Sequence, residues 1–510
     1  MKRREFLKYA AAAGSIGAYP QVLSASNNPT FSDFKAIVMV DLQGGNDALN
    51  SFIPTGSDAK TGYNNYVEQR SKSIAIPNKD LMDNLRNLVS GGALQIGSPS
   101  DNPYYIRVNE AENYMKGFYL LDKNNFDSKI AINAMMPELA YWMDQGRGAV
   151  IQNVGNISAP YNKSDLQKDT GKLPPSIFAH NVQNLLAHLG YASSMSMPTG
   201  WLGKLADQWG NVNGNTIYKM NINLSSYGID HAMFGANTRP MNYSYLGPTK
   251  LDRSIHNDFE AWVNKRPTAS QDIFRKLHMI LRGNSYNETL TTSTDWDNLN
   301  KNNPFENVAD VYGNLIYQGR NEVSKAQMGI GNPINDRVVE SFKTAAKLIA
   351  IAKNKGFKRI VLSIVVPGFD QHSNLKQDHS LRIRGLSYGI DTFMRAMDSQ
   401  GWLDEVLVAS LSDFSRSTAS NGDGSDHAWG GAQFVLGAVN PGNYGVFPDL
   451  TVGGDQDISK RGRLIPTTSY SQYYGEILKW FGASSDEIGH ALPELKNFTS
   501  VATNLNFMKS

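Results

Sequence analysis

The 510-residue sequence contains no cysteine. Because the chain has no thiol, disulfide bonds, thiolate metal ligands and a cysteine nucleophile are all excluded. Beyond the first 25 residues it also lacks an apolar run long enough for a transmembrane helix, so we expect no permanent membrane span. The fold must then depend on an apolar core, for which a chain of this length is ample.

A surplus of basic residues is missing too. The chain has 49 Lys and Arg against 47 Asp and Glu, a net charge of +2. Residues 1–25 alone carry a net +3, which leaves −1 for the rest of the chain. No zinc finger, helix-turn-helix or RNP motif is present either. This balance predicts that the protein has no nucleic-acid partner.

The N-terminus has the pattern of an export signal. The stretch Lys2–Lys8 contains two adjacent arginines followed by Phe and Leu, and a weakly apolar run continues to Tyr19. Small residues around Ala25 offer a cleavage region. We therefore expect a twin-arginine signal peptide over residues 1–25, the twin-arginine export machinery as a partner, and a periplasmic or secreted location.

Five short apolar runs have the composition of strands buried on both faces of a sheet. They cover residues 36–40, 149–151, 359–366, 406–411 and 433–436. Helical patterns lie between them at residues 136–145, 336–354 and 379–400. The last of these joins the third run to the fourth and makes a βαβ unit, which implies parallel strands.

This alternation predicts an α/β fold with a doubly wound, mostly parallel sheet and helices on both faces. We expect residues 30–505 to form one such domain. The stretch 210–332 differs because it is rich in Asn, Tyr and Ser. We interpret it as an insertion or cap beside the sheet.

Polar residues follow two of the predicted strands. Asp370 and His372 come after the third run, and Asp413 ends the fourth. Ligands in open α/β sheets bind beyond the carboxyl ends of the strands, where this topology places all three residues. Carboxylate and imidazole groups are common metal ligands, so we predict one or more divalent ions such as Zn, Mn, Mg or Ca. A hydrogen-bonded loop pair is the alternative for Asp370 and His372.

A glycine-rich loop before the fifth run holds two more candidates. His427 is a possible metal ligand, and Asp426 is either a ligand or a partner that fixes the tautomer of His427. Arg416 lies near them and is a candidate for holding an anionic group, with a surface ion pair as the alternative. His180 opens a helical stretch and is a candidate catalytic residue, or else a packing residue.

The turn after the first run reads Gly44-Gly45-Asn46-Asp47. Its glycines allow backbone amides to approach a ligand closely. Asp47 is a candidate metal ligand. A plain turn in which Asp47 caps the following segment fits the same pattern.

These motifs together resemble the exported bacterial family known as domain of unknown function 1501. The family's hallmarks are a Gly-Gly-x-Asp-x-Leu-Asn turn, a Gly-Phe-Asp-x-His segment, a Ser-(Glu/Asp)-Phe-x-Arg segment and a glycine-rich stretch ending in Asp-His. This sequence has all four, at residues 44–50, 368–372, 412–416 and 422–427, together with Gly-Trp-Leu-Gly at 200–203. The resemblance covers essentially the chain beyond the signal.

The resemblance implies a relationship to the alkaline phosphatase and sulfatase superfamily, whose members often use two metal ions to hydrolyse phosphate or sulfate esters. It assigns metal-binding roles to Asp47, or else Asp41, and to four later residues. These are Asp370, His372, Asp413 and His427. The sequence departs from the superfamily in two places, because Phe414 stands where a histidine usually follows the later aspartate and Ala179 stands where many relatives have serine. Ser176 is close to Ala179 in the sequence, but it does not align with the serine of those relatives.

From these patterns we expect an exported metal-dependent hydrolase of a phosphate or sulfate ester, with a small-molecule, polysaccharide or lipid ester as substrate. The nucleophile would be a metal-activated water or a residue not yet identified. The alternative is a non-catalytic binding or assembly protein of the same fold with a degraded metal site. A metal-dependent enzyme of another kind, such as an isomerase or mutase, is a third possibility.

Overall fold

The computed structural model describes residues 29–90, 114–127, 129–170, 173–214, 218–224, 230–248, 288–310, 313–318, 333–498 and 505–509. The predicted signal peptide, residues 1–25, lies outside these ranges. So do residues 249–287 and 319–332, which make up much of the segment that we expected to be an insertion.

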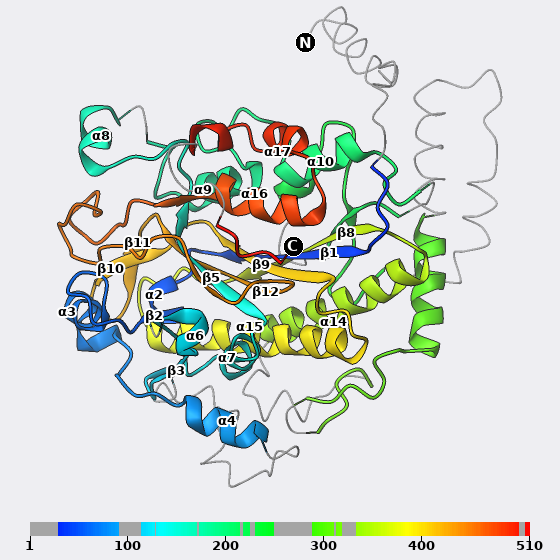
Figure 1. Ribbon diagram of the computed structural model, residues 1–510, viewed down its shortest axis with the longest axis horizontal. Coiled ribbons are helices and arrows are strands. Elements are labelled where there is room, and N and C mark those ends of the chain that lie inside the picture. The colour runs from blue at the N-terminus through cyan, green and yellow to red at the C-terminus, as the bar shows by residue number, and fades with distance from the viewer. Residues whose placement is uncertain are drawn as a thin grey trace, which may run out of the picture.

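A nine-stranded sheet runs through the centre of the molecule (Figure 1). Its main path follows the order β13-β5-β12-β9-β1-β8-β6-β7, and β14 pairs with β5 beside it. The strands are β1 (Lys35–Gln43), β5 (Gly148–Gly155), β6 (Asn221–Asn223), β7 (Met241–Asn242), β8 (Arg359–Pro367), β9 (Val406–Ser412), β12 (Gly431–Gly437), β13 (Gly442–Tyr444) and β14 (Thr468–Ser469).

Most neighbours in this sheet are parallel, and only β12 runs antiparallel to both of its neighbours, β9 and β5. All five predicted strands are present, so the expected mixed α/β fold with a mostly parallel sheet is confirmed. β1 lies between β8 and β9, with Gln43 opposite Pro367 and Leu42 opposite Ser412. The loops that follow these three strands therefore leave the sheet at the same edge.

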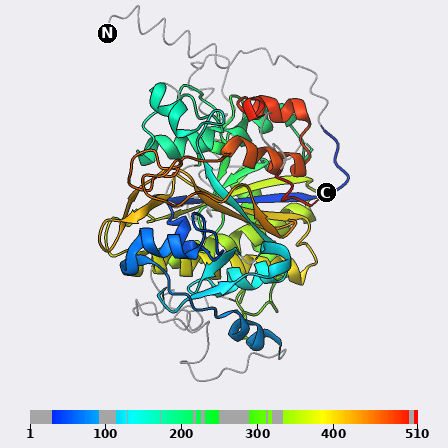
Figure 2. The same ribbon diagram turned by 60° about the vertical axis from the view of Figure 1, so that its left-hand side comes forward.

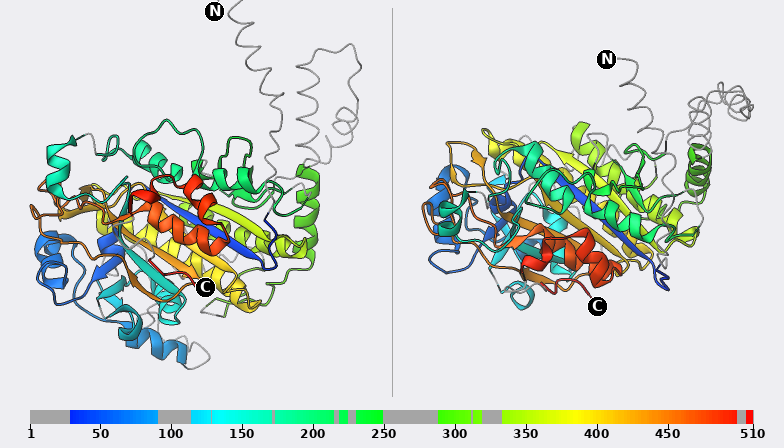
Figure 3. Two further views of the ribbon diagram at one scale, coloured as in Figure 1. Left: turned by 45° about the horizontal axis from the view of Figure 1, so that its top comes forward. Right: turned by 90° about the horizontal axis from the view of Figure 1, so that it is seen from above.

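Helices cover both faces of the sheet (Figures 1 and 2). One face carries α7 (Pro137–Asp144), α14 (Pro333–Asn354) and α15 (Leu375–Ser399). The other carries α9 (His180–Leu189), α10 (Trp201–Trp209), α16 (Tyr470–Phe481) and α17 (Ser485–Ala491), and the separation of the two layers is also visible in Figure 3.

The side chains of β1 explain this two-layer arrangement. Successive residues of a strand point to opposite faces of the sheet. Val38 and Val40 accordingly belong to the core shared with α14 and α15, whereas Ile37 and Met39 belong to the core shared with α10 and α16. All four side chains are fully buried. A continuous apolar run is what such a doubly covered strand requires.

Several smaller elements surround the sheet and were not expected from the sequence. Near the site, a hairpin is formed by β10 (Arg416–Ser420) and β11 (Ser425–His427). The others are α2 (Ala48–Ser51), α3 (Tyr63–Ile74), α4 (Met82–Ser90), α6 (Lys123–Phe126), α8 (Lys163–Lys168) and a three-stranded sheet of β2 (Phe52–Pro54), β3 (Phe118–Leu120) and β4 (Ile130–Asn133).

Two strands of the segment 210–332, β6 and β7, extend the edge of the central sheet next to β8. This part of the segment therefore belongs to the main domain. A search of the described helices for one with the length and apolar character needed to cross a membrane finds none.

Candidate metal centre

The loop after β1 packs closely against the loops after β8 and β9. Gly44 has φ +112°, and a Cβ atom there would lie 2.6 Å from the backbone nitrogen of Asp370. Its own N–H donates to Oδ2 of Asp413 over 3.1 Å. The glycine that we expected to let the backbone approach a ligand thus lets the β1 loop contact the Asp370 and Asp413 loops.

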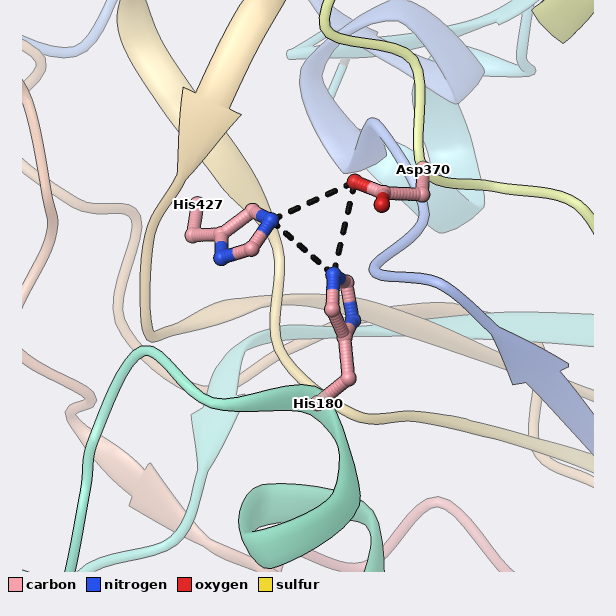
Figure 4. Close-up of side chains that lie close together, drawn as sticks. All are labelled: His180, Asp370 and His427. Carbon is pink, nitrogen blue, oxygen red and sulfur yellow. Dashed lines mark hydrogen bonds and ion pairs between the residues drawn. The ribbon is translucent and has the colours of Figure 1, made fainter.

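Three imidazoles and one carboxylate converge where these loops meet, and Figure 4 shows three of the four side chains. Nε2 of His427 lies 2.9 Å from Nε2 of His180, 2.8 Å from Nε2 of His372 and 3.2 Å from Oδ1 of Asp370. The same carboxylate oxygen is 3.3 Å from Nε2 of His180 and 3.1 Å from Nε2 of His372. His180 starts α9, so the helix layer contributes to a site otherwise built from strand ends.

The other nitrogen of each imidazole faces a hydrogen-bond acceptor. Nδ1 of His427 is 2.8 Å from the carbonyl oxygen of Phe178, and Nδ1 of His180 is 2.8 Å from Oδ2 of Asp413. A carbonyl oxygen can only accept, so Nδ1 of His427 carries the proton and its Nε2 keeps a free lone pair. This second contact is the one that metal-binding histidines make, because it fixes the tautomer and the ring orientation.

Charge favours the protonation states that a metal ion needs. Burial opposes ionisation of Asp370, but the hydrogen bond and charge of Arg416, with His180 and His372, lower the pKa of this carboxyl to about 2. Burial lowers the pKa of His427, although the Phe178 carbonyl acts in the other direction. An ionised carboxylate and a neutral imidazole are the forms that bind metal.

The four groups fit a transition-metal ion. Ligand atoms of His180, Asp370 and His427 all lie within 4.8 Å of one another, and His372 contacts two of these three residues. Zinc takes such nitrogen and oxygen ligands at about 2.0–2.2 Å in tetrahedral geometry. An imidazole-rich set suits Zn, Fe, Cu or Ni better than Mg, Ca or Mn, which prefer oxygen.

Asp413 and Asp426 lie behind the imidazoles. Asp413 is almost fully buried and holds His180, as described above, while Oδ1 of Asp426 is 3.5 Å from Nδ1 of His372. Burial and the charge of Asp41 raise the pKa of Asp413, against the hydrogen bond from His180. Both aspartates therefore orient histidines instead of joining the converging atoms. Asp426 contacts His372, not His427 as we expected.

Arg416 does not present a free cation to the site. Its side chain is buried, and its donors are occupied by four backbone carbonyls and one carboxylate. The acceptors are the carbonyls of Gly44 (2.7 Å), Gly45 (3.0 Å), Phe369 (3.0 Å) and Ser425 (3.2 Å), and Oδ1 of Asp370. Nη1 of Arg416 also lies 3.5 Å from Nε2 of His372. These contacts make Arg416 a residue that ties the loops together and aims Asp370, in place of the anion-holding role that we expected.

Asp47 lies apart from the converging groups. Its side chain is fully buried and pairs with Arg70, which is also fully buried. Burial raises the pKa of Asp47, although Arg70 and Arg416 act to lower it. Asp47 occupies the position before α2, but its side chain makes no capping hydrogen bond. The structure brings it neither into the cluster nor into the capping role.

Asp41, the second choice for a first-strand carboxylate, lies closer to the site. The side-chain amide of Asn184 in α9 is 3.1 Å from both carboxylate oxygens of Asp41 and 3.0 Å from Oδ1 of Asp413. One amide therefore bridges the two buried carboxylates. Nothing in the sequence singled out Asn184, although its position one turn after His180 on the same helix could have done so.

His188 stands on the far side of Asp41. Its Nε2 is 3.2 Å from Oδ2 of Asp41 and 3.6 Å from Oδ1 of Asp230, and all three side chains are fully buried. Burial opposes protonation of His188, but the charges of Asp230 and Asp41 outweigh it and raise the pKa to about 9. The two carboxylates therefore favour the protonated form of His188.

A cavity of about 430 Å³ opens beside the cluster. His180, Asp370 and Asp413 contribute to its wall. The remaining lining residues are Gln43, Gly44, Asn181, Asn184, Pro367 and Gly368. A ligand in this cavity would touch the candidate metal ligands directly.

No hydroxyl nucleophile stands out among the described residues. Ser176 is exposed, and Ala179 precedes His180 at the start of α9. A Gly-x-Ser-x-Gly stretch occurs at residues 385–389, but it lies in the middle of α15, where Ser387 is buried and donates to Glu138. It is not the exposed strand-to-helix turn that a serine hydrolase requires.

The chain is similar to one protein family and to a solved structure. No curated protein matches the chain. A solved structure titled "Crystal structure of Ps i-CgsB" is similar over 71% of each chain, with 12% identity and a TM-score of 0.30, which is too low to support an argument. The family model described as "Protein of unknown function (DUF1501)" matches residues 322–464. That match includes Asp370, His372 and His427, and it supports the resemblance to this family over the stretch that supplies most of the centre.

Proposed function

We propose that this protein is a metal-dependent hydrolase that acts on a phosphate or sulfate ester. The observation that carries the proposal is the convergence of Nε2 of His180, Nε2 of His427 and Oδ1 of Asp370 at the edge of the sheet. From the export pattern of residues 1–25 we also propose that it works outside the cytoplasm.

The chain's own residues would hold and orient the centre. Asp370, His180 and His427 would bind one divalent ion, with His372 as a further ligand. Asp413 and the Phe178 carbonyl keep two of the imidazoles in the tautomer that ligation needs. A bound divalent ion supplies Lewis acidity and activates water at neutral pH. The adjacent cavity would place the ester next to His180 and Asp370.

Elemental analysis of the purified protein tests the metal site. We expect about one equivalent of a transition metal in the wild type and loss of that metal in Asp370→Ala and His427→Ala. Asp423→Ala is a matched control, because Asp423 is an exposed carboxylate in the same region. If the wild type binds no divalent ion under any loading condition, the hydrolase proposal fails.

A panel of phosphate monoesters, phosphate diesters and sulfate esters then tests the chemistry. We expect metal-dependent turnover of at least one class, which is lost in His427→Ala and retained in Asp423→Ala. The lack of a hydroxyl at Ala179 favours a second candidate, a binding protein that uses the metal to hold an oxyanion. Full metal occupancy with no turnover on any ester, together with measurable binding of phosphate or sulfate, would favour that second candidate.

A further inference from the structure

A cationic turn lies next to the candidate metal centre and takes no part in the contacts described so far. It comprises residues 460–463, with Lys460 and Arg461 exposed and Arg463 partly buried. The guanidinium of Arg463 stacks on the ring of Phe178 at 4.1 Å from the ring centroid. Phe178 also supplies the carbonyl that orients His427, so the turn is connected to the centre through this one residue.

Arg461 approaches the centre from a second direction. Its guanidinium lies 3.8 Å from Oδ2 of Asp426, whose other oxygen faces Nδ1 of His372 at 3.5 Å. Only one carboxylate thus separates Arg461 from a candidate ligand. The pair with Asp426 is long and exposed, and such pairs are weak. Arg461 would exchange it readily for a better anionic partner.

The turn is held rigidly in place. The fully buried carboxylate of Asp457 accepts hydrogen bonds from the backbone nitrogens of Ser459 (3.0 Å), Gly462 (2.8 Å) and Arg463 (3.0 Å). Lys460 has φ +59°, a conformation that costs a non-glycine residue energy. A cationic turn fixed in this way loses little conformational entropy when it binds.

The charge of the turn is only partly compensated, because Asp426 pairs with Arg461 and the charges of Asp426 and Asp457 also act on Arg463. Among the described residues, no carboxylate forms a salt bridge or hydrogen bond with the side chain of Arg463 or Lys460, and Nε of Arg463 is buried without a hydrogen-bond partner. Arginine presents several donors in one plane that match phosphate or sulfate oxygens. By contrast, the donors of Arg416 are occupied by backbone carbonyls and Asp370. Arg461 and Arg463 are cations beside the centre whose side chains have no such set of partners among the described residues.

We propose that the turn Lys460–Arg463 is a second anion-binding subsite, which holds a sulfate or phosphate group of the substrate other than the ester being cleaved. The substrate class is then a polyanion that carries repeated oxyanion groups. This inference rests on the proposed function for the identity of the substrate, but anion binding by the turn can be measured separately.

The test measures binding of the metal-loaded, full-length protein to dextran sulfate, to polyphosphate and to neutral dextran of similar length. We expect binding to one or both polyanions, no binding to neutral dextran, and weaker binding as salt increases. The double variant Arg461→Gln/Arg463→Gln should lower the affinity at least about tenfold, since each charged hydrogen bond contributes appreciably. The relative affinities for the two polyanions would show whether the subsite prefers sulfate or phosphate.

Two further variants keep the test decisive. Arg461→Gln alone changes a side chain that is 66% exposed, so it should fold normally and still weaken binding. Lys479→Gln/Lys496→Gln removes two exposed cations elsewhere on the surface and should leave binding unchanged. Wild-type affinity in the Arg461/Arg463 variants, or equal binding of neutral dextran, would overturn the inference. Metal content and hydrolysis of small esters, measured on the same samples, report separately on the proposed function.

Discussion

Replacing Asp413 by asparagine separates a positioning residue from a metal ligand. In the structure Oδ2 of Asp413 lies 2.8 Å from Nδ1 of His180 and does not join the converging atoms. Asparagine has the same size but no charge. Loss of a carboxylate that orients a metal-bound histidine typically weakens metal binding by about 10–100-fold. We therefore expect Asp413→Asn to weaken it by about 1.4–2.7 kcal/mol.

Stability should change only modestly in this variant. Both carboxylate oxygens of Asp413 accept hydrogen bonds, from Gly44 and Asn184, and asparagine can keep only one of these two acceptors. The repulsion from Asp41 is, however, relieved at the same time. Asp413 is buried close to Asp41, and burial and the charge of Asp41 raise the pKa of Asp413. The proximity of the two carboxylates therefore lowers the stability of the native protein. A change in metal affinity would then not reflect unfolding. Thermal denaturation of the metal-free protein checks this point.

The assay is a competition titration against a fluorescent chelator at neutral pH, with Asp423→Asn as the control. Wild-type affinity in Asp413→Asn would refute the positioning role and cast doubt on His180 as a ligand. Complete loss of binding, as we expect for Asp370→Asn, would instead make Asp413 a direct ligand, as the family resemblance implies.

Three other outcomes follow from the structure. Arg384→Met should lower the free energy of unfolding by about 3–5 kcal/mol in urea titrations, because it strands the fully buried carboxylate of Glu138. Gly44→Ala should lower metal occupancy in elemental analysis and destabilise the fold by about 1–3 kcal/mol, since the new Cβ would lie 2.6 Å from the Asp370 nitrogen at φ +112°. His188 has a pKa raised from 6.5 to about 9, so its stabilisation of about 3 kcal/mol is complete below pH 6.5 and lost as the pH rises through 9. Urea titrations across this range should show that decline in the wild type and little of it in His188→Gln.

The central sheet could be predicted because its strands are continuous apolar runs. Residues 359–366 and 406–411, joined by one long helix, indicated parallel strands, and the structure has both beside β1. That order places Asp370 and Asp413 at one edge. The short strands β6 and β7 gave no such signal, since two or three residues carry too little pattern.

Most residues of the site could be identified from the sequence, but the roles of several of them could not. Asp370, His372 and His427 converge as their spacing suggested, and His180 joins them from a distant helix. The functions of Arg416 and Asp47 depend on which partners surround them, and those partners, such as Arg70, come from parts of the chain that no local pattern connects. The same holds for Arg461 and Arg463, whose importance lies only in their position beside Phe178 and Asp426.

The most direct test of the metal centre is a crystal structure of the metal-loaded protein with data collected at the absorption edge of the ion. We expect one anomalous peak about 2.0–2.2 Å from Nε2 of His180, Nε2 of His427 and Oδ1 of Asp370. An empty position between these atoms in crystals that contain the metal, or a peak at Asp47 instead, would contradict this expectation.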